Sequence, residues 1–94
     1  MKTENNQYGL NNAAALAKQY PDTFHVPTDL EIDRIQEGDS IKVCSHGERF
    51  WCTVKFISEN KFYCIVDSDT GNKTYRYMEP VIVERVNIYS IHKK

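Results

Sequence analysis

Thiol and imidazole side chains, the usual ligands of zinc, gather in one stretch of the chain. By type, Cys44, His46, Cys52 and Cys64 would suit a tetrahedral zinc site. Their spacing, C-x-H-x5-C-x11-C, lacks the closely spaced cysteine pairs of zinc modules. Cys52 and Cys64 also alternate with apolar neighbours, as buried strand residues do. We therefore predict no metal site and expect the cysteines to act as small hydrophobic residues.

Catalysis would need a nucleophile and a base within reach of each other, or a glycine loop that binds phosphate. The histidines, His25, His46 and His92, are scattered along the sequence, and the four glycines form no phosphate-binding motif. Serine-hydrolase and metalloprotease motifs are absent from the sequence as well. The sequence thus predicts a protein that is not an enzyme, with no catalytic residue and no cofactor.

The single tryptophan, Trp51, lies in the patterned stretch GERFWCTVKF. If this stretch is a strand, Phe50 and Cys52 face one side while Arg49 and Trp51 face the other. Beside Arg49, Trp51 would then form an exposed aromatic platform with Tyr63, Tyr75 and Tyr77. Such surfaces bind peptides, methylated lysines or single-stranded nucleic acid.

A second interpretation of Trp51 is structural. In it, N-terminal helices cover the outer face of the strands, and the indole ring anchors them. The apolar side chains that would pack on the ring are Leu16, Tyr20, Phe24 and Leu30. These side chains need a surface to bury against. The sequence alone leaves both interpretations open.

The N-terminal third of the chain contains the helix signals. Residues 1–11 are polar and unpatterned, so we expect a flexible N-terminus followed by one domain over residues 12–94. The run NAAALAKQY is rich in strong helix formers and predicts a helix over residues 12–20, with Asn12 as its N-cap.

A capping-box pattern at Thr28 and Glu31 predicts a second helix over residues 29–36. The region is acidic: residues 22–39 hold six acidic residues against one cation, Arg34. We expect these acids to form a solvated helix face. The alternative is an acidic docking surface, whose contact residues would be Asp29, Asp33 and Glu37.

Apolar positions alternate from residue 40 to residue 91, which predicts strands. Residues 58–61 have the composition of a hairpin turn, and the adjacent Phe56 and Ile57 indicate a bulge, which would bend its strand. The predicted interior consists of Phe50, Cys52, Val54, Phe62, Cys64, Val66, Val81 and Val83. We predict a mainly β (α+β) domain: a small, strongly bent, antiparallel SH3-like barrel of four or five strands over residues 40–91, preceded by one or two short helices.

Charge and hydropathy limit the partners. The formal net charge is −1, so nucleic acid is not an expected partner. No apolar run approaches the ~20 residues that span a bilayer, and we expect no membrane association and a cytoplasmic location. An unpaired strand edge near residues 74–78 would allow a homodimer.

Four segments, EGDSIKV, GERFWCTV, NKFYCIVD and PVIVERVNIYSI, resemble the YegJ-like bacterial family of small domains of unknown function. The resemblance covers about residues 28–91, and Pro80 and Ser90 stand where the family pattern has acidic residues. It implies a compact β-rich domain and no settled activity, so it transfers no catalytic residue. The aromatic strand is also similar to those of SH3-like and Tudor-like barrels, which are binding modules.

These observations together predict a non-catalytic interaction module. It would hold a protein or peptide partner through the Trp51 face and the loop over residues 67–78. The alternative is a small inhibitor or decoy protein of mobile-element type, which would present its acidic segment to a nucleic-acid-binding protein. Binding by such a decoy would weaken steeply with ionic strength.

Overall fold

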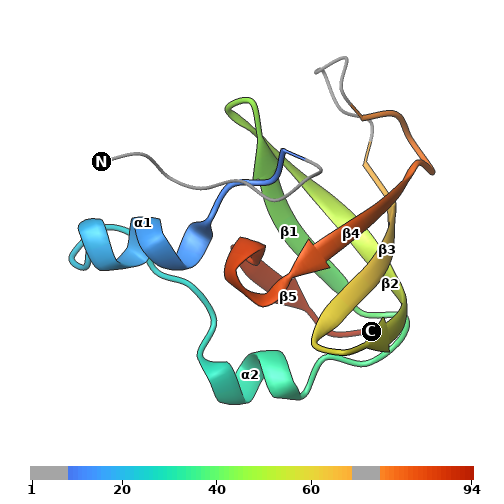
Figure 1. Ribbon diagram of the computed structural model, residues 1–94, viewed down its shortest axis with the longest axis horizontal. Helices are drawn as coiled ribbons and strands as arrows, with labels where there is room; N and C mark the ends of the chain where they lie inside the picture. The colour runs from blue at the N-terminus through green and yellow to red at the C-terminus, as the bar shows by residue number, and fades with distance from the viewer. Residues whose placement is uncertain (1–8, 69–74) are drawn as a thin grey trace.

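The computed structural model describes residues 9–68 and 75–94, which form one antiparallel sheet of five strands (Figure 1). The strands are β1 (Ser40–Ser45), β2 (Glu48–Ser58), β3 (Lys61–Val66), β4 (Pro80–Glu84) and β5 (Ser90–His92). Two helices, α1 (Ala13–Gln19) and α2 (Asp29–Asp33), precede them, and the 3-10 turn η1 (Arg85–Asn87) joins β4 to β5. The predicted mainly β, antiparallel architecture with two short helices is confirmed.

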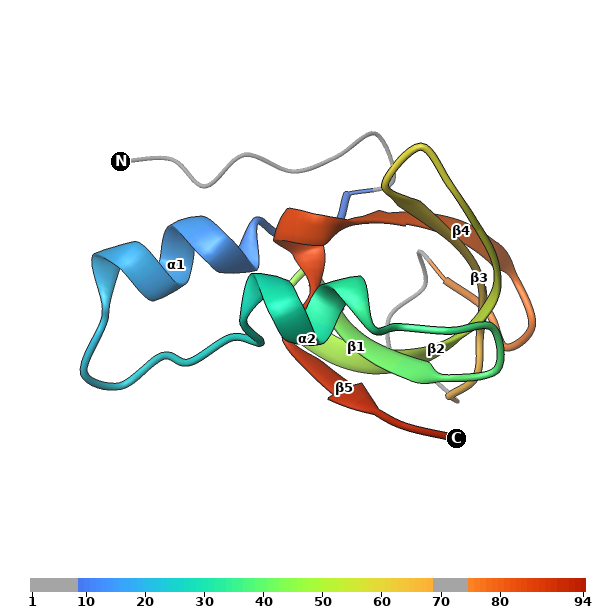
Figure 2. The same ribbon diagram turned by 90° about the horizontal axis from the view of Figure 1, so that it is seen from below.

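The sheet has the spatial order β4-β3-β2-β1-β5 and is strongly curved (Figures 1 and 2). Its last strand along the chain, β5, pairs with its first, β1, through Ser40–His92, Ile41–Ile91 and Lys42–Ser90. β4 and β5 are the two edges. Among the described residues no strand ladder joins β4 to β5, so the sheet is open along this line.

The hydrophobic core lies on the concave face of the sheet. All eight residues of the predicted interior, from Phe50 to Val83, are buried there, each no more than 3% exposed. Ile41 and Val43 of β1 join the same cluster. The two-residue rhythm of the sequence therefore identifies the inner face correctly, because successive strand side chains point to opposite sides.

A bulge at Lys55 changes the alternation within β2. Val54 pairs with Cys64, but the next pair is Phe56 with Tyr63, so Lys55 has no opposite residue on β3. The bulge that Phe56 and Ile57 indicate is confirmed, and the Phe56 side chain is 49% exposed and stacks on Tyr63. The extra residue turns every later side chain of β2 to the opposite face.

Two tight turns set the strand register. Glu59 and Asn60, which join β2 to β3, both have positive φ angles of 52° and 64°. His46 and Gly47, between β1 and β2, have φ angles of 52° and 80°. Two consecutive positive φ angles match the twist of a two-residue hairpin, and the predicted turn over residues 58–61 is confirmed.

Both helices begin where the sequence predicts and end earlier. Asn12 caps α1 by accepting a hydrogen bond of 2.9 Å from the Ala15 amide, and Thr28 and Glu31 form the expected capping box of α2. α2 is one turn long and supplies the core residue Ile32. Seen from below, α2 lies against one end of the curved sheet, and α1 extends away beside η1 (Figure 2).

The segment just before α1 belongs to the packed domain. Leu10 is fully buried in the core, and the Asn11 amide donates a 2.8 Å hydrogen bond to the carbonyl of Cys44. The predicted flexible N-terminus therefore extends too far where it includes residues 9–11. Residues 1–8 lie outside the described part. Leu10 is an isolated apolar residue in a polar stretch, so periodicity gave no signal for its burial.

Asn87 connects this N-terminal segment to η1. Its side-chain amide donates to the carbonyl of Asn11 at 3.0 Å and to that of Leu10 at 3.4 Å. Its Oδ1 accepts a 2.8 Å hydrogen bond from the Glu84 amide, and the residue is only 1% exposed. Every hydrogen-bonding atom of this buried amide is thus used to join distant segments.

Replacement of Asn87 by alanine is expected to lower the free energy of unfolding by ~2 kcal/mol, because buried carbonyls and an amide lose their partner. Urea denaturation followed by circular dichroism measures this change. Gln19→Ala, at an exposed position of α1, is the matched control and should change stability by less than ~0.5 kcal/mol. An Asn87→Ala cost no larger than that of the control would contradict the assigned role.

Asp39 forms a second link, between the start of β1 and the C-terminal residues. It is 2% exposed, and its carboxylate accepts hydrogen bonds of 2.9 Å from the backbone amides of Gln36 and Lys94. The ammonium of Lys93 donates a hydrogen bond to the same carboxylate.

In the described residues, no helix has the length and apolar character needed to cross a membrane.

Candidate functional site

Trp51 lies on the convex, outer face of the sheet, in the middle of three strands. It is half-buried, and its ring is flanked by side chains from two neighbouring strands. The ammonium of Lys42, its cross-strand partner on β1, lies 5.2 Å from the ring centroid. The imidazole of His92 on β5 meets the ring edge-on, with 6.3 Å between centroids. Trp51 is therefore held in a defined orientation while part of its surface stays open.

The backbone of Trp51 is fixed by the segment that follows β3. Its amide donates a 2.8 Å hydrogen bond to the hydroxyl of Ser68, and its carbonyl accepts one of 2.8 Å from the Asp67 amide. The Asp67 carboxylate accepts a hydrogen bond of 2.9 Å from the Thr53 hydroxyl. These contacts place an acidic group beside the ring.

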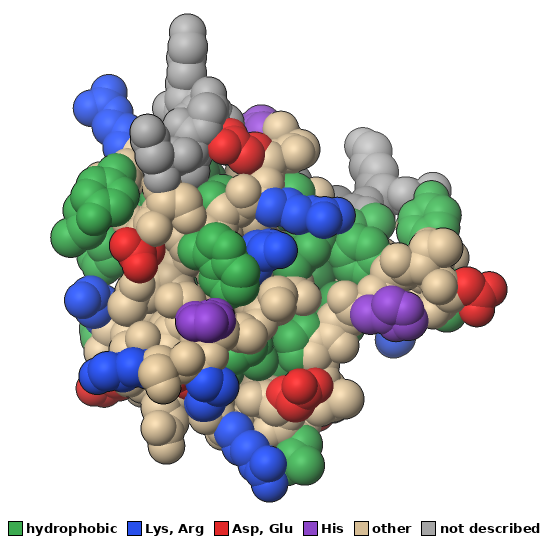
Figure 3. All heavy atoms as spheres, turned by 180° about the vertical axis from the view of Figure 1, so that it is seen from behind, with side chains coloured by type: hydrophobic (Ala, Val, Ile, Leu, Met, Phe, Trp, Pro, Cys, Tyr) green, Lys and Arg blue, Asp and Glu red, His purple; other side chains and the backbone are tan. Residues whose placement is uncertain are grey.

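Two hollows adjoin Trp51 and Lys42. The first, of about 370 Å³, is lined by Ser40, Trp51, Asp67 and His92. The second, of about 280 Å³, is lined by Thr23, Phe24, His25, Lys42, Arg49, Tyr89 and Ser90. We call the first the tryptophan hollow and the second the basic hollow. Figure 3 shows the molecule from behind, where hydrophobic, basic and histidine side chains lie side by side.

Tyr89 forms one wall of the basic hollow. Its ring packs edge-on against Phe24, with 5.2 Å between centroids, and the guanidinium of Arg49 lies 5.3 Å from the ring centre. Burial, the nearby Cys44 and a hydrogen bond with it raise the pKa of Tyr89 to about 12. The phenol is therefore neutral at physiological pH and adds no negative charge to the hollow.

Of the residues of the predicted aromatic platform, Trp51 lies partly exposed on the outer face, whereas Tyr75 is buried. Tyr75 is 4% exposed and packs in the core, with its ring 5.2 Å from that of Phe50. The prediction failed because alternation cannot be read through a loop, where no strand fixes the direction of a side chain. Tyr77, three residues before β4 begins at Pro80, is 61% exposed.

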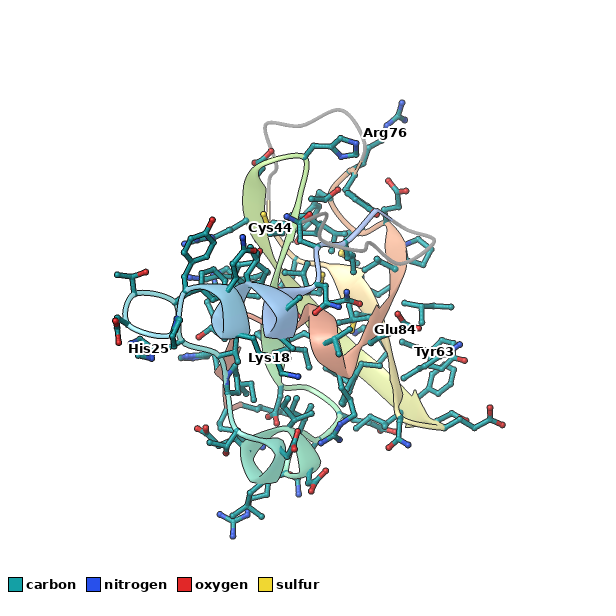
Figure 4. The ribbon with its side chains drawn as sticks, turned by 60° about the vertical axis from the view of Figure 1, so that its left-hand side comes forward. Lys18, His25, Cys44, Tyr63, Arg76 and Glu84 are labelled. Carbon is teal, nitrogen blue, oxygen red and sulfur yellow. The ribbon has the colours of Figure 1, made fainter. Side chains whose placement is uncertain are left out.

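Tyr63 lies on the outer face as predicted, but in a separate cluster. Its cross-strand neighbour is Phe56, on which it stacks with 4.3 Å between ring centroids. Figure 4 shows Tyr63 beside Glu84 at one side of the molecule and His25, which lines the basic hollow, at the other. Along β2 and β3, the Thr53–Ile65 pair lies between Trp51 and the Phe56–Tyr63 pair.

The structural interpretation of Trp51, as an anchor for the helices, is also not what the contacts show. The ring contacts described for Trp51 are with Lys42 and His92, both in the sheet. Tyr20 and Leu30, two of its four expected partners, are 51% and 59% exposed. Phe24 packs on Tyr89 instead. α1 contacts η1, and α2 contributes Ile32 to the core.

The acidic segment of the alternative docking surface is partly neutralised. Arg85 contacts the carboxylates of Asp33 at 2.9 Å and Asp29 at 3.6 Å. Glu37, the third predicted contact residue, is exposed. The sequence could not predict that a cation from η1 would lie against α2, since the two are more than fifty residues apart.

The cysteines divide between the two faces of the sheet. Cys52 and Cys64 are core residues, and burial raises the pKa of Cys64 to about 12 and that of Cys52 further still. Both therefore remain neutral thiols, as the prediction of small hydrophobic residues requires. Cys44 is buried beneath Asn11 and Tyr89 on the opposite face. No group of three potential metal ligands occurs within residues 9–68 and 75–94.

Three residues of the site were missed from the sequence: Lys42, Tyr89 and His92. For Lys42 a signal existed, because a two-residue turn at His46 and Gly47 fixes the register and places it opposite Trp51. Tyr89 and His92 gave no such signal, since their positions depend on the pairing of β5 with β1.

Comparison of the chain with family models, curated proteins and solved structures finds no match.

Proposed function

We propose that this protein is a non-catalytic interaction module that binds a protein or peptide segment on its outer face around Trp51. The observation that carries the proposal is the partly exposed indole ring, held between Lys42 and His92 on the outer face of the sheet. Trp51 combines a large apolar surface with a hydrogen-bond donor, and tryptophan and arginine are enriched among residues that dominate binding energy. Arg49 lies two residues away on the same face.

We also propose that the fold is of SH3-like type. The support is the pairing of β5 with β1, the bulge that bends β2 and the 3-10 turn between β4 and β5. In this interpretation side-chain packing, rather than a ladder, closes the curved sheet between β4 and β5. The similarity to the YegJ-like family and the cytoplasmic location are part of the same proposal.

The partner in this proposal is a protein rather than a nucleic acid, because the net charge is −1. A homodimer through a sheet edge is an additional proposal, since β5 is an edge strand that pairs with β1 alone among the strands of residues 9–68 and 75–94. The predicted contribution of residues 69–74 to the binding surface lies outside the described residues.

Replacement of Trp51 by alanine is expected to weaken peptide binding at least about 10-fold, the effect of losing a binding hot spot. Peptides selected on the wild-type protein from a displayed random library supply the ligands, and calorimetric titration measures their affinity. Tyr63→Ala is the matched control, because Tyr63 is an aromatic residue of the outer face in the separate cluster with Phe56. Equal affinity of wild type and Trp51→Ala would contradict the proposal.

The acidic decoy is the less supported function, because Arg85 already pairs with Asp29 and Asp33. A decoy of this kind would bind a basic protein through Asp29, Asp33 and Glu37. Its affinity would fall steeply between low and high salt and would not depend on Trp51. Titration of the same variants at two salt concentrations separates the two functions.

A further inference from the structure

The basic hollow is distinct in its charge. Two of its seven lining residues, Lys42 and Arg49, are cationic, His25 adds an imidazole, and none of the seven is acidic. The ion pairs given for the described residues use Arg85 and Lys93, not Lys42 or Arg49. Two cations thus line one concave site without a carboxylate within it.

The two cations are oriented before any ligand arrives. Lys42 lies over the Trp51 ring and Arg49 lies over the Tyr89 ring, at 5.2 and 5.3 Å from the centroids. Tyr89 is itself fixed by Phe24 and by the hydrogen bond from its backbone amide to the Lys42 carbonyl, of 2.8 Å. Side chains held in this way lose less entropy when they bind an anion.

Resting on the function proposed above, we infer that the basic hollow receives the carboxylate of an acidic side chain of the bound peptide, while a neighbouring apolar residue of that peptide contacts Trp51. A guanidinium forms two parallel hydrogen bonds with a carboxylate, and the hydroxyls of Ser90 and Thr23 line the same hollow as further donors. Lys42 joins the two subsites, because it lines the basic hollow and contacts Trp51.

The charge around the site favours a peptide over a nucleic acid. Asp67 lines the tryptophan hollow on the other side of the ring. A polyanion that followed the outer face would place phosphates against this carboxylate, which disfavours it electrostatically. A peptide can instead present an acidic residue to Lys42 and Arg49 and a hydrogen-bond donor or cation to Asp67. The site therefore predicts a ligand of mixed charge.

The test uses the displayed random library selected in parallel on the wild-type protein and on the Lys42→Gln/Arg49→Gln double variant. Aspartate and glutamate should be enriched in wild-type binders and not in binders of the double variant. For a wild-type binder, replacement of its glutamate by glutamine should weaken binding at least about 10-fold to wild type. The same replacement should have less than about 3-fold effect on the double variant.

Lys55→Gln is the control, since Lys55 is an exposed cation on β2, the strand of Arg49, and does not line the basic hollow. Binders without acidic residues, equal losses in both proteins, or tighter binding of a single-stranded oligonucleotide than of the peptides would each overturn the inference. If the Trp51→Ala variant loses binding while acidic residues have no effect, only this inference fails. If Trp51→Ala binds normally, or no peptide is selected, the proposed function fails with it.

Discussion

Replacement of Phe50 by alanine should lower the free energy of unfolding by ~3–5 kcal/mol, which would leave so small a domain close to unfolding. Phe50 is 2% exposed, lies in the core and packs on Tyr75. Removal of its ring leaves a cavity and takes away the buried partner of Tyr75. Urea denaturation followed by circular dichroism measures the loss.

The adjacent residue on the same strand supplies the matched comparison. Trp51 is larger than Phe50 but half-buried on the opposite face, where its ring contacts are Lys42 and His92. Trp51→Ala should therefore cost only about 1 kcal/mol, the range of a cross-strand contact. A loss for Trp51→Ala equal to that of Phe50→Ala would mean that the two faces of β2 have been assigned wrongly.

Replacement of Asp39 by asparagine should cost ~2–4 kcal/mol of unfolding free energy at neutral pH. The new amide group would face the hydrogen-bond donors that now point at the carboxylate, so at least one buried donor would lose its acceptor. Glu37→Gln provides the control, because Glu37 is an exposed acid two residues away. A cost for Asp39→Asn no greater than that of the control would mean that the Asp39 carboxylate does not stabilise the link between the start of β1 and residues 93–94.

The same carboxylate makes stability depend on pH. Burial alone would raise the pKa of Asp39, but hydrogen bonds from Lys93 and from the amides of Lys94 and Gln36 outweigh burial and lower it. The folded pKa therefore lies below the unfolded value of about 3.9, and the stabilisation is complete above that pH and lost as pH falls through the folded pKa. Urea denaturation at a series of pH values below 6 should show that the free energy of unfolding falls more steeply with decreasing pH for the wild type than for Asp39→Asn.

The strands, the turn between β2 and β3 and the inward faces follow from local signals in the sequence. In β2 and β3, Phe50, Cys52 and Cys64 occupy every second position of their strands, and each is buried. Short-range turn chemistry at Asn60 and the capping box at Thr28 act within four residues. A pattern of this kind determines which side chains face inward without knowledge of the rest of the fold.

The candidate site depends on contacts between segments distant in sequence, and these were only partly predictable. His92 and Tyr89 reach the outer face because β5 returns to pair with β1. Arg85 contacts Asp33 because η1, which joins β4 to β5, lies near α2 in the fold. Tyr75 lies outside the helices and strands, where side-chain direction has no period. Such contacts are set by tertiary packing, and single-sequence reasoning about period and propensity does not include them.

The pairing of the first strand with the last also constrains when this protein can fold. On the ribosome, β1 emerges long before β5, so during synthesis it has a neighbour on one side only. Until residues 90–94 leave the exit tunnel, one edge of β1 and the carboxylate of Asp39 lack their partners Ser90, Ile91 and Lys93. The domain therefore cannot be completed before these residues emerge, and the nascent chain is most open to chaperones and to wrong pairings until then.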